Sequence, residues 1–483
     1  MTLLNRKSIK LNAILNVARQ LCSVLFPLIT IPYVTRILHA ENLGKVNFSS
    51  SVISYFSLIA SMGIVNYGIR EGAKVRNDKN EFHKFANEIF TINIITTLLA
   101  YILLIVTVLV SNKLQSYIPL LVVQSSSMLF VTLGADWINN IYEDFLYITI
   151  RSILAQFISL ALMFIFVRNT NDYVIYAFVT VFAQVGVNIV NMFYIRKYTT
   201  LKLVFPTNLR KHLKPIVVLF FNNVAMTVYI NSDSTMLGYL VDDSAVGIYN
   251  ISTRIYTVIK HVINAIVTVA LPRLSAYASE DKGKYRNLLN EVFESIITVL
   301  FPTITGLFMI STPIVSLLSG DEFIGAATAL KVLSISLVFA VFGGFYTVCV
   351  LVPNRKDKSL LIATSFAAVC NIILNFFFIP LWSYIGASIT TLFAELIVML
   401  ITWHSSRSIV SLRIKKDIII PVIICCAVII VECIAVKMLL KSDAGTVVVS
   451  VVISTISYIV LMAMFKNPLI LSVINKLKNF IKR

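Results

Sequence analysis

Long runs without a charged residue constrain this chain more than any other feature of its sequence. An α-helix needs about 20 apolar residues to cross a bilayer, and runs near that length recur along the chain. A longer run, Ser359 to Ala394, has room for two helices and is divided by Pro380. Weaker segments lie around 12–33, 215–240, 247–270 and 418–437, and the set predicts about fourteen transmembrane helices. The clearest runs are Val46–Ile69, Ile89–Asn112, Leu114–Ala135, Ser152–Val167, Tyr173–Ile195, Ser295–Gly320, Val332–Asn354 and Ala444–Phe465.

The composition points to the same class of protein. Apolar side chains make up 58% of the 483 residues and charged side chains only 13%, whereas soluble domains carry about 25% charged residues. We therefore predict an all-α, polytopic membrane protein. The six cysteines all lie inside apolar runs, without metal-ligand spacing, and are expected to be buried apolar side chains. No resident metal or other cofactor is expected.

The net charge of +18 indicates membrane topology rather than nucleic-acid binding. Most of the 41 Lys and Arg residues fall in every second segment between predicted helices, counted from the N-terminus. Because short cytoplasmic loops are enriched in Lys and Arg, both termini are predicted to be cytoplasmic. One predicted cytoplasmic loop, 134–148, departs from the pattern, since it carries Asp136, Glu143 and Asp144 and no basic residue. Residues 466–483 predict a basic amphipathic helix on the inner membrane surface.

The chain contains an internal repeat with a shift of 203 residues. Polar loop residues match without a gap, and shared hydrophobicity does not explain them. The shift preserves helix orientation, so we predict two parallel six-helix bundles, 1–197 and 215–405, related by a pseudo-two-fold axis along the membrane normal. A basic cytoplasmic linker, 198–214, joins them, and 406–465 adds two helices. The pairs are Gly44/Gly247, Asn47/Asn250, Ser49/Ser252, Arg70/Arg273, Ala73/Ala276, Asp78/Asp281, Lys79/Lys282, Asn87/Asn290, Glu88/Glu291 and Phe90/Phe293.

Cations inside the predicted spans are candidate functional residues, because charge is costly in a bilayer and usually faces a cavity or a partner. Arg19 and Arg254 each lie well inside a span, one in each half, and are predicted to bind an anionic substrate. Lys260, six residues after Arg254, either joins them or points elsewhere. Arg151 and Lys331 lie near span ends, where a long side chain can reach the headgroups, and this is the interpretation we favour.

Acidic and amide side chains in the spans suggest ion coupling. Asp233 and Glu395 either pair with a cation or bind a coupling Na⁺ or H⁺; Glu432, outside the repeat, is the weakest candidate. Asn371 and Asn375 are four residues apart on one helix face. They either supply oxygen ligands to a small cation or form interhelical hydrogen bonds.

Several stretches together resemble bacterial O-antigen and capsule repeat-unit flippases, in the polysaccharide transporter branch of the multidrug/oligosaccharidyl-lipid/polysaccharide exporter superfamily. They are FPLITIPYVTRIL, ENLGKVNFSSSVISYFSLIASMGIVNYGIREGAKVRND, ADWINNIYEDFLYITIRSI and VDDSAVGIYNISTRIY. The sequence departs from the family pattern at His39, where glycine is frequent, and at Asn139 and Asn140, in place of a Gln-Gly pair.

The resemblance implies a two-lobed transporter. It would move an undecaprenyl-diphosphate-linked oligosaccharide from the inner to the outer leaflet by alternating access, as part of surface polysaccharide synthesis. Arg19 and Arg254 match arginines that line the cavity of the related lipid II flippases, although this chain has no arginine in its second span. The sodium site of those flippases would fall on Asp233, Asn371, Asn375 and Thr391, with Asn375 in place of an aspartate.

Two other classes of protein remain as alternatives. A cation-coupled drug exporter of the same superfamily would favour an acidic cavity and twelve spans. A membrane polysaccharide polymerase or glycosyltransferase would need a large loop or soluble domain and a catalytic motif, and the sequence shows neither a D-x-D pair nor a Gly-rich phosphate loop. The expected partners are the lipid-linked oligosaccharide, membrane lipids, and the polymerase and glycosyltransferases of the same pathway.

Overall fold

The protein is all-helical in the computed structural model, which describes residues 9–205, 209–410, 412 and 415–472. Within these residues, eleven helices are long and apolar enough to cross a membrane. They expose large apolar side chains, such as Leu109, Val110 and Val269, as helices in contact with lipid do. The all-α membrane class is confirmed, and the count of fourteen stays a prediction.

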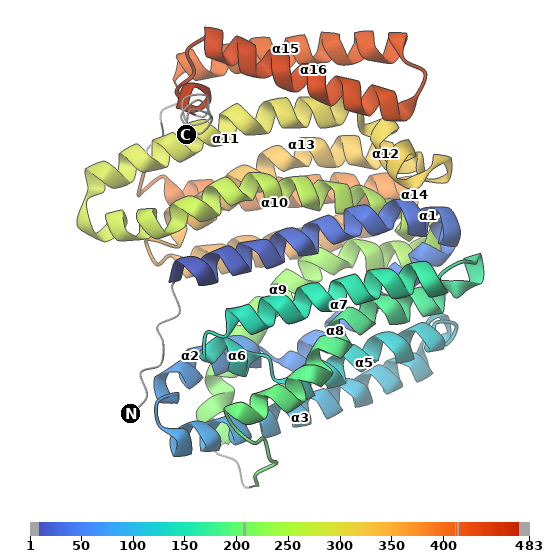
Figure 1. The fold of residues 1–483 in the computed structure, drawn as a ribbon, viewed down its shortest axis with the longest axis vertical. Helices are drawn as coiled ribbons and strands as arrows, with labels where there is room; N and C mark the ends of the chain where they lie inside the picture. The colour runs from blue at the N-terminus through green and yellow to red at the C-terminus, as the bar shows by residue number, and fades with distance from the viewer. Residues whose placement is uncertain (1–8, 206–208, 411, 413–414, 473–483) are drawn as a thin grey trace. The chain divides into compact units, whose positions relative to one another are not determined.

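The chain divides into two compact units, Met1–Gly247 and Ile248–Arg483, each described here by itself (Figure 1). The first contains α9, which the sequence assigned to the second bundle; the predicted bundle boundaries stay a prediction. The helices of unit 1 are α1 (Ile9–Ser61), α2 (Ile64–Val75), α3 (Lys79–Val110), α4 (Asn112–Gln115), α5 (Ile118–Gly134), α6 (Trp137–Ile141), α7 (Phe145–Phe166), η1 (Thr170–Asp172), α8 (Tyr173–Tyr194), η2 (Ile195–Lys197) and α9 (Leu209–Leu240).

The boundary between the units falls in α10 (Asp243–Glu280), whose first turn belongs to unit 1. The other helices of unit 2 are α11 (Lys282–Met309), α12 (Ser311–Ser319), η3 (Asp321–Phe323), α13 (Gly325–Phe345), the π-helical η4 (Tyr346–Leu351), α14 (Asp357–Ser406), α15 (Lys416–Leu439) and α16 (Asp443–Met464).

Several predicted spans are interrupted. The run Val46–Ile69 breaks at Gly63, which has a φ of 75°, and the run Ser295–Gly320 is divided between α11 and α12 at Ile310. The long run in α14 does turn back on itself. It does so at Ser383 (φ 50°) rather than Pro380, and a side chain at Gly386 would overlap the Phe378 carbonyl.

Equivalent helices in the two halves begin in the same way, as the repeat requires. Asp78 caps α3 by accepting hydrogen bonds from the backbone N–H of Asn80 and Glu81, at 2.8 and 3.1 Å. Asp281, 203 residues later, caps α11 through Gly283 and Lys284, at 2.9 and 3.0 Å. These contacts lower the pKa of the Asp281 carboxyl, which therefore acts as an ionised acceptor.

The apolar core of unit 1 lies where α2, α3, α6 and the start of α9 meet. Phe82, Phe85, Ile89 and Trp137 are buried there. Because α6 is anchored by Trp137, the turn immediately before it is held in place, and this turn carries Asp136.

Candidate functional site

A polar cavity of about 930 Å³ lies inside unit 1, among α1, α3 and α5–α9. Its volume is within the range of about 300–1,000 Å³ that is usual for small-molecule sites. The polar residues that line it are Ser50, Ser54, Ser57, Ser61, Asn93, Ser127, Thr132, Asp136, Asn140, Arg151, Ser152, Gln156, Gln184, Asn188, Asn223, Thr227 and Asn231.

The turn between α5 and α6 directs Asp136 into this cavity. Helix α5 ends at Gly134, and Ala135 follows in the left-handed conformation, with a φ of 43°. Gly134 packs against Asn188 so closely that a Cβ would overlap its side chain. Glycine is therefore required for α8 to approach the turn.

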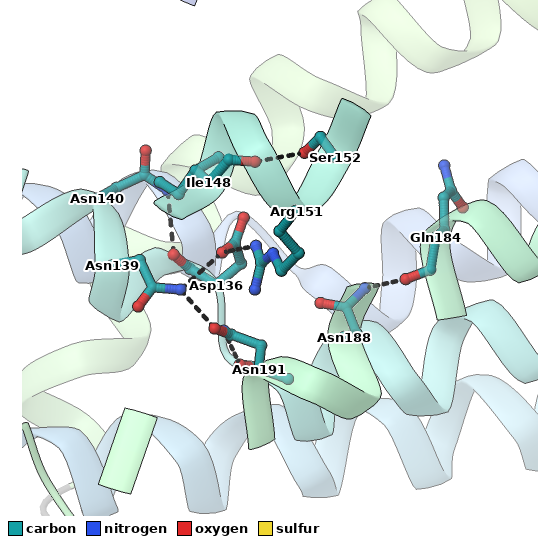
Figure 2. Close-up of polar contacts among 10 residues, drawn as sticks. Asp136, Asn139, Asn140, Ile148, Arg151, Ser152, Gln184, Asn188 and Asn191 are labelled. Atoms are coloured by element: carbon teal, nitrogen blue, oxygen red, sulfur yellow. Dashed lines mark hydrogen bonds and ion pairs between the residues drawn. The ribbon is translucent and has the colours of Figure 1, made fainter. Parts of the chain in front are cut away.

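Asp136 forms an ion pair with Arg151, at the centre of the close-up in Figure 2. The Arg151 Nη2 donates to Asp136 Oδ1 at 2.5 Å, and Asn139 Nδ2 donates to the same oxygen at 2.9 Å. The Arg151 side chain is only 5% exposed, whereas that of Asp136 is 36% exposed. The group that the pair presents to the cavity is thus the carboxylate.

Amide groups hold the acidic turn against α8. Asn139 Nδ2 also donates to Asn191 Oδ1 at 2.6 Å, and Asn191 Nδ2 donates to the Gly134 carbonyl at 2.6 Å (Figure 2). Asn140 Nδ2 donates to the Asp136 carbonyl at 3.0 Å. The position of the Asp136 carboxylate is therefore fixed by side chains from α6, α7 and α8.

The prediction that Arg151 extends to the headgroups is wrong. Helix α7 begins at Phe145, before the charge-free run, so Arg151 lies inside the helix and not at its start. Its guanidinium packs over the Tyr147 ring at 4.9 Å, and its Nε and Nη1 have no hydrogen-bond acceptor among the described residues. The Arg151 side chain is therefore buried inside unit 1, where it pairs with Asp136, and does not reach the lipid headgroups.

The other two acids of the 134–148 loop have separate partners. Glu143 pairs with Arg76 on the surface, at 2.9 Å. Asp144 is buried and accepts hydrogen bonds from the hydroxyls of Tyr194 and Tyr198, at 2.6 and 2.8 Å. Burial and the neighbouring Asp144 raise the pKa of Tyr198, which keeps its hydroxyl protonated as a donor.

In unit 2, the structure brings together two of the residues predicted for different roles. Lys260 Nζ on α10 donates to Glu395 Oε1 on α14 at 2.5 Å, and the Tyr256 hydroxyl donates to the same oxygen at 3.1 Å. The Lys260 ammonium also lies over the Tyr256 ring, at 5.4 Å. Their roles in substrate binding and ion coupling stay predictions.

The predicted amide pair lies inside the α14 hairpin. Asn375 Nδ2 donates to Asn371 Oδ1 at 3.2 Å, and Asn375 Oδ1 accepts from Thr390 on the returning half. Thr391 contacts the hydroxyl of Tyr249 at 3.1 Å. Within the described residues, no group of three or more His, Cys, Asp or Glu could hold a metal ion.

The remaining candidates are Arg254, Asp233, Arg19, Glu432 and Lys331. Arg254 is half-buried on α10 and makes no ion pair with any described residue, whereas Asp233 is buried on α9 in unit 1. Arg19 belongs to α1, but its side chain lies outside the described residues. Glu432 accepts a hydrogen bond from Ser457 at 3.0 Å, and Lys331 lies over the Phe308 ring at 6.0 Å.

The amides that line the unit 1 cavity were not among the residues predicted from the sequence. Gln156, Gln184 and Asn188 lie in spans that are otherwise apolar, and amides are less conspicuous there than charges. The signal that could have found the site is the acidic 134–148 loop, which precedes Arg151 in the chain.

Comparisons with known proteins place the chain in a class and then in a family. The fold matches that of "Lipid II flippase MurJ, inward closed conformation", with a TM-score of 0.73 at 16% identity, over 95% of this chain and 100% of that one. The comparison with an inward-facing multidrug resistance MATE family transporter of the MOP superfamily gives a TM-score of 0.59 at 14% identity, over 79% of this chain and 94% of that chain.

The chain belongs to the polysaccharide biosynthesis protein family, whose model matches residues 9–278. It is 24% identical over 409 residues to a "Putative O-antigen transporter" of Escherichia coli (strain K12), covering 82% of this chain and 95% of that protein. It is also 24% identical over 415 residues to "Capsular polysaccharide biosynthesis protein CapF" of Staphylococcus aureus, covering 82% of this chain and 97% of that protein. The predicted family is confirmed.

Proposed function

We propose that this protein is a flippase for an undecaprenyl-diphosphate-linked oligosaccharide repeat unit. It moves the repeat unit from the inner to the outer leaflet of the bacterial cell membrane by alternating access, coupled to a Na⁺ or H⁺ gradient. Its product feeds the synthesis of a surface polysaccharide such as O-antigen or capsule. Both termini face the cytoplasm, and the polymerase and glycosyltransferases of the pathway act with it.

The observation that carries the proposal is a cavity lined by many polar side chains among apolar membrane helices, in a chain whose relatives are named for O-antigen transport and capsule synthesis. A hydroxyl moved from water into hydrocarbon without a partner costs about 4–8 kcal/mol. An oligosaccharide carries many hydroxyls, so it crosses a bilayer only where amides and hydroxyls replace water.

Arg254 is the residue that would bind the diphosphate. Guanidinium groups bind phosphate through paired, charge-assisted hydrogen bonds. The Lys260 charge is already engaged by Glu395, whereas Arg254 has no acidic partner among the described residues. The charge of Arg254 is therefore available to a ligand.

The test replaces Arg254 with Ala in a bacterium that lacks its own repeat-unit flippase and expresses this chain. Hydrogen bonds to a charged group are worth about 1.5–3 kcal/mol, so R254A should reduce surface polysaccharide about tenfold or more. The lipid-linked repeat unit should accumulate inside the cell. Arg407→Ala is the control, because Arg407 is exposed and lies over the Trp403 ring. Normal display with R254A at wild-type protein level would contradict the proposal, and loss of drug efflux instead would favour the exporter alternative.

A further inference from the structure

Among the described residues, the unit 1 cavity offers little available positive charge for binding a diphosphate. Asp136 and Arg151 are the only charged residues among those described that line it, and they neutralise each other. The accessible member of the pair is Asp136. The carboxylate taken alone would repel a phosphate charge about 4 Å away by about 4 kcal/mol at an effective dielectric constant near 20, and the buried Arg151 offsets part of this repulsion without adding a net attraction.

The cavity matches a carbohydrate much better. A pyranose ring offers neighbouring hydroxyls, each both donor and acceptor, and apolar C–H faces. The Asp136 carboxylate can accept from two hydroxyls, and a side-chain amide can donate to one and accept from its neighbour. Ile53, Leu58, Met226 and Ile230 supply apolar wall to the same cavity.

Two glutamines of the cavity have unused hydrogen-bonding groups. The side-chain amides of Gln156 on α7 and Gln184 on α8 make no hydrogen bond within the described part of the chain. Arg151, in contrast, is more than nine-tenths buried and donates a hydrogen bond to Asp136. The cavity thus combines a fixed carboxylate acceptor with amides that have no partner of their own.

We propose that the unit 1 cavity is the glycan-recognition site of the transporter, with Asp136 accepting hydrogen bonds from sugar hydroxyls and Gln156 and Gln184 binding further hydroxyls. Arg151 is the positioning residue for Asp136. The inference rests on the proposed flippase function and deepens it, since it separates binding of the sugar from binding of the diphosphate by cations elsewhere.

The experiment uses Trp137 as a reporter, because it lies beside Asp136 and lines the cavity. The chain has three tryptophans, and the other two, Trp382 and Trp403, are exposed, so Trp382→Phe and Trp403→Phe leave one emitter. The purified full chain in detergent is titrated with the oligosaccharide released by mild acid from the lipid-linked repeat units of the host. This probe carries neither lipid nor phosphate. We expect a saturable change in Trp137 emission.

Variants separate recognition from folding. Asp136→Asn and the pair Gln156→Leu with Gln184→Leu should each weaken oligosaccharide binding about tenfold or more. Glu143→Gln, in the same loop but paired with Arg76 on the surface, should leave binding unchanged. Because a lone buried cation is destabilising, D136N is repeated together with Arg151→Gln. This double variant should remain folded and still bind weakly. Arg151→Gln alone should weaken binding, and Arg151→Lys should restore most of it.

The outcomes distinguish this inference from the flippase proposal. If the chain flips the lipid-linked repeat unit but Trp137 does not respond to the released oligosaccharide, the glycan site is overturned and the flippase stands. If the oligosaccharide binds and D136N weakens it, but no flipping occurs, the glycan site stands and the flippase proposal fails. An equal response to maltotriose would also overturn recognition of the repeat unit.

Discussion

At the residue scale, buried polar groups of unit 1 are paired across helices that are distant in sequence. His212, near the start of α9, is 2% exposed and links α2 to α3. Its Nε2 lies 2.9 Å from Glu88 Oε2, and its Nδ1 lies 2.7 Å from the Tyr67 hydroxyl. A neutral ring satisfies both neighbours, donating to Glu88 and accepting from Tyr67. The three side chains therefore hold α9 against α2 and α3.

We predict that His212→Leu destabilises unit 1. His212 does not line the unit 1 cavity, so the lining itself is unchanged. The change leaves the Glu88 carboxylate and the Tyr67 hydroxyl without their shared partner in a buried place, at a cost of about 1–3 kcal/mol. Thermal unfolding of the purified protein in detergent should shift to lower temperature. Lys84→Ala, an exposed change on α3, should not shift it. An unfolding temperature for H212L equal to wild type would show that the contact contributes nothing.

At the element scale, a pair of repeated glycines determines how closely α1 approaches the first turn of α10. A Cβ on Gly44 would overlap the carbonyl of Asp243, and a Cβ on Gly247 would overlap the carbonyl of Ala40. The 203-residue shift turns one contact into the other, because it carries Ala40 onto Asp243 and Gly44 onto Gly247. The repeat found in the sequence therefore forms a local two-fold contact. Nearby, the Tyr117 hydroxyl donates to both Asp243 carboxylate oxygens, at 2.6 and 2.7 Å.

Valine at either glycine should prevent this approach. Backbone atoms, unlike the ends of flexible side chains, cannot move aside cheaply, and overpacking costs about 1–3 kcal/mol or more. We expect Gly44→Val and Gly247→Val each to lower the unfolding temperature and the yield of folded protein. Gly306→Ala is the matched control, because a Cβ at this helical glycine of α11 meets nothing within 4 Å. Since alanine favours a helix over glycine by about 1 kcal/mol, G306A should be neutral or stabilising. Equal behaviour of all three variants would refute the close contact.

At the scale of the whole molecule, the sequence predicts what depends on composition and misses what depends on packing. Charge-free runs identified most membrane helices, and α8 and α16 match theirs within a residue or two. The repeat pairs Asp78 with Asp281, and in the structure each of them caps a helix. The position of Arg151 was misjudged because a hydropathy pattern ends a span at a charged residue, whereas α7 continues through Arg151, which is paired with Asp136. The sequence left open that Glu395 pairs with a cation, but it did not identify Lys260 as the partner, because 135 residues separate the two.

The orientation of the molecule depends on the charge distribution and can be tested directly. Positively charged loops stay on the cytoplasmic side, so Lys284, after α10, should lie inside and Arg168, after α7, should lie outside. Both side chains are exposed. In a variant with its six cysteines replaced, a membrane-impermeant maleimide on intact cells should label Arg168→Cys. It should label Lys284→Cys only after permeabilisation. Because the loops alternate, these two positions determine the side of both termini. The reverse labelling would place the termini outside and invert the direction of transport that we propose.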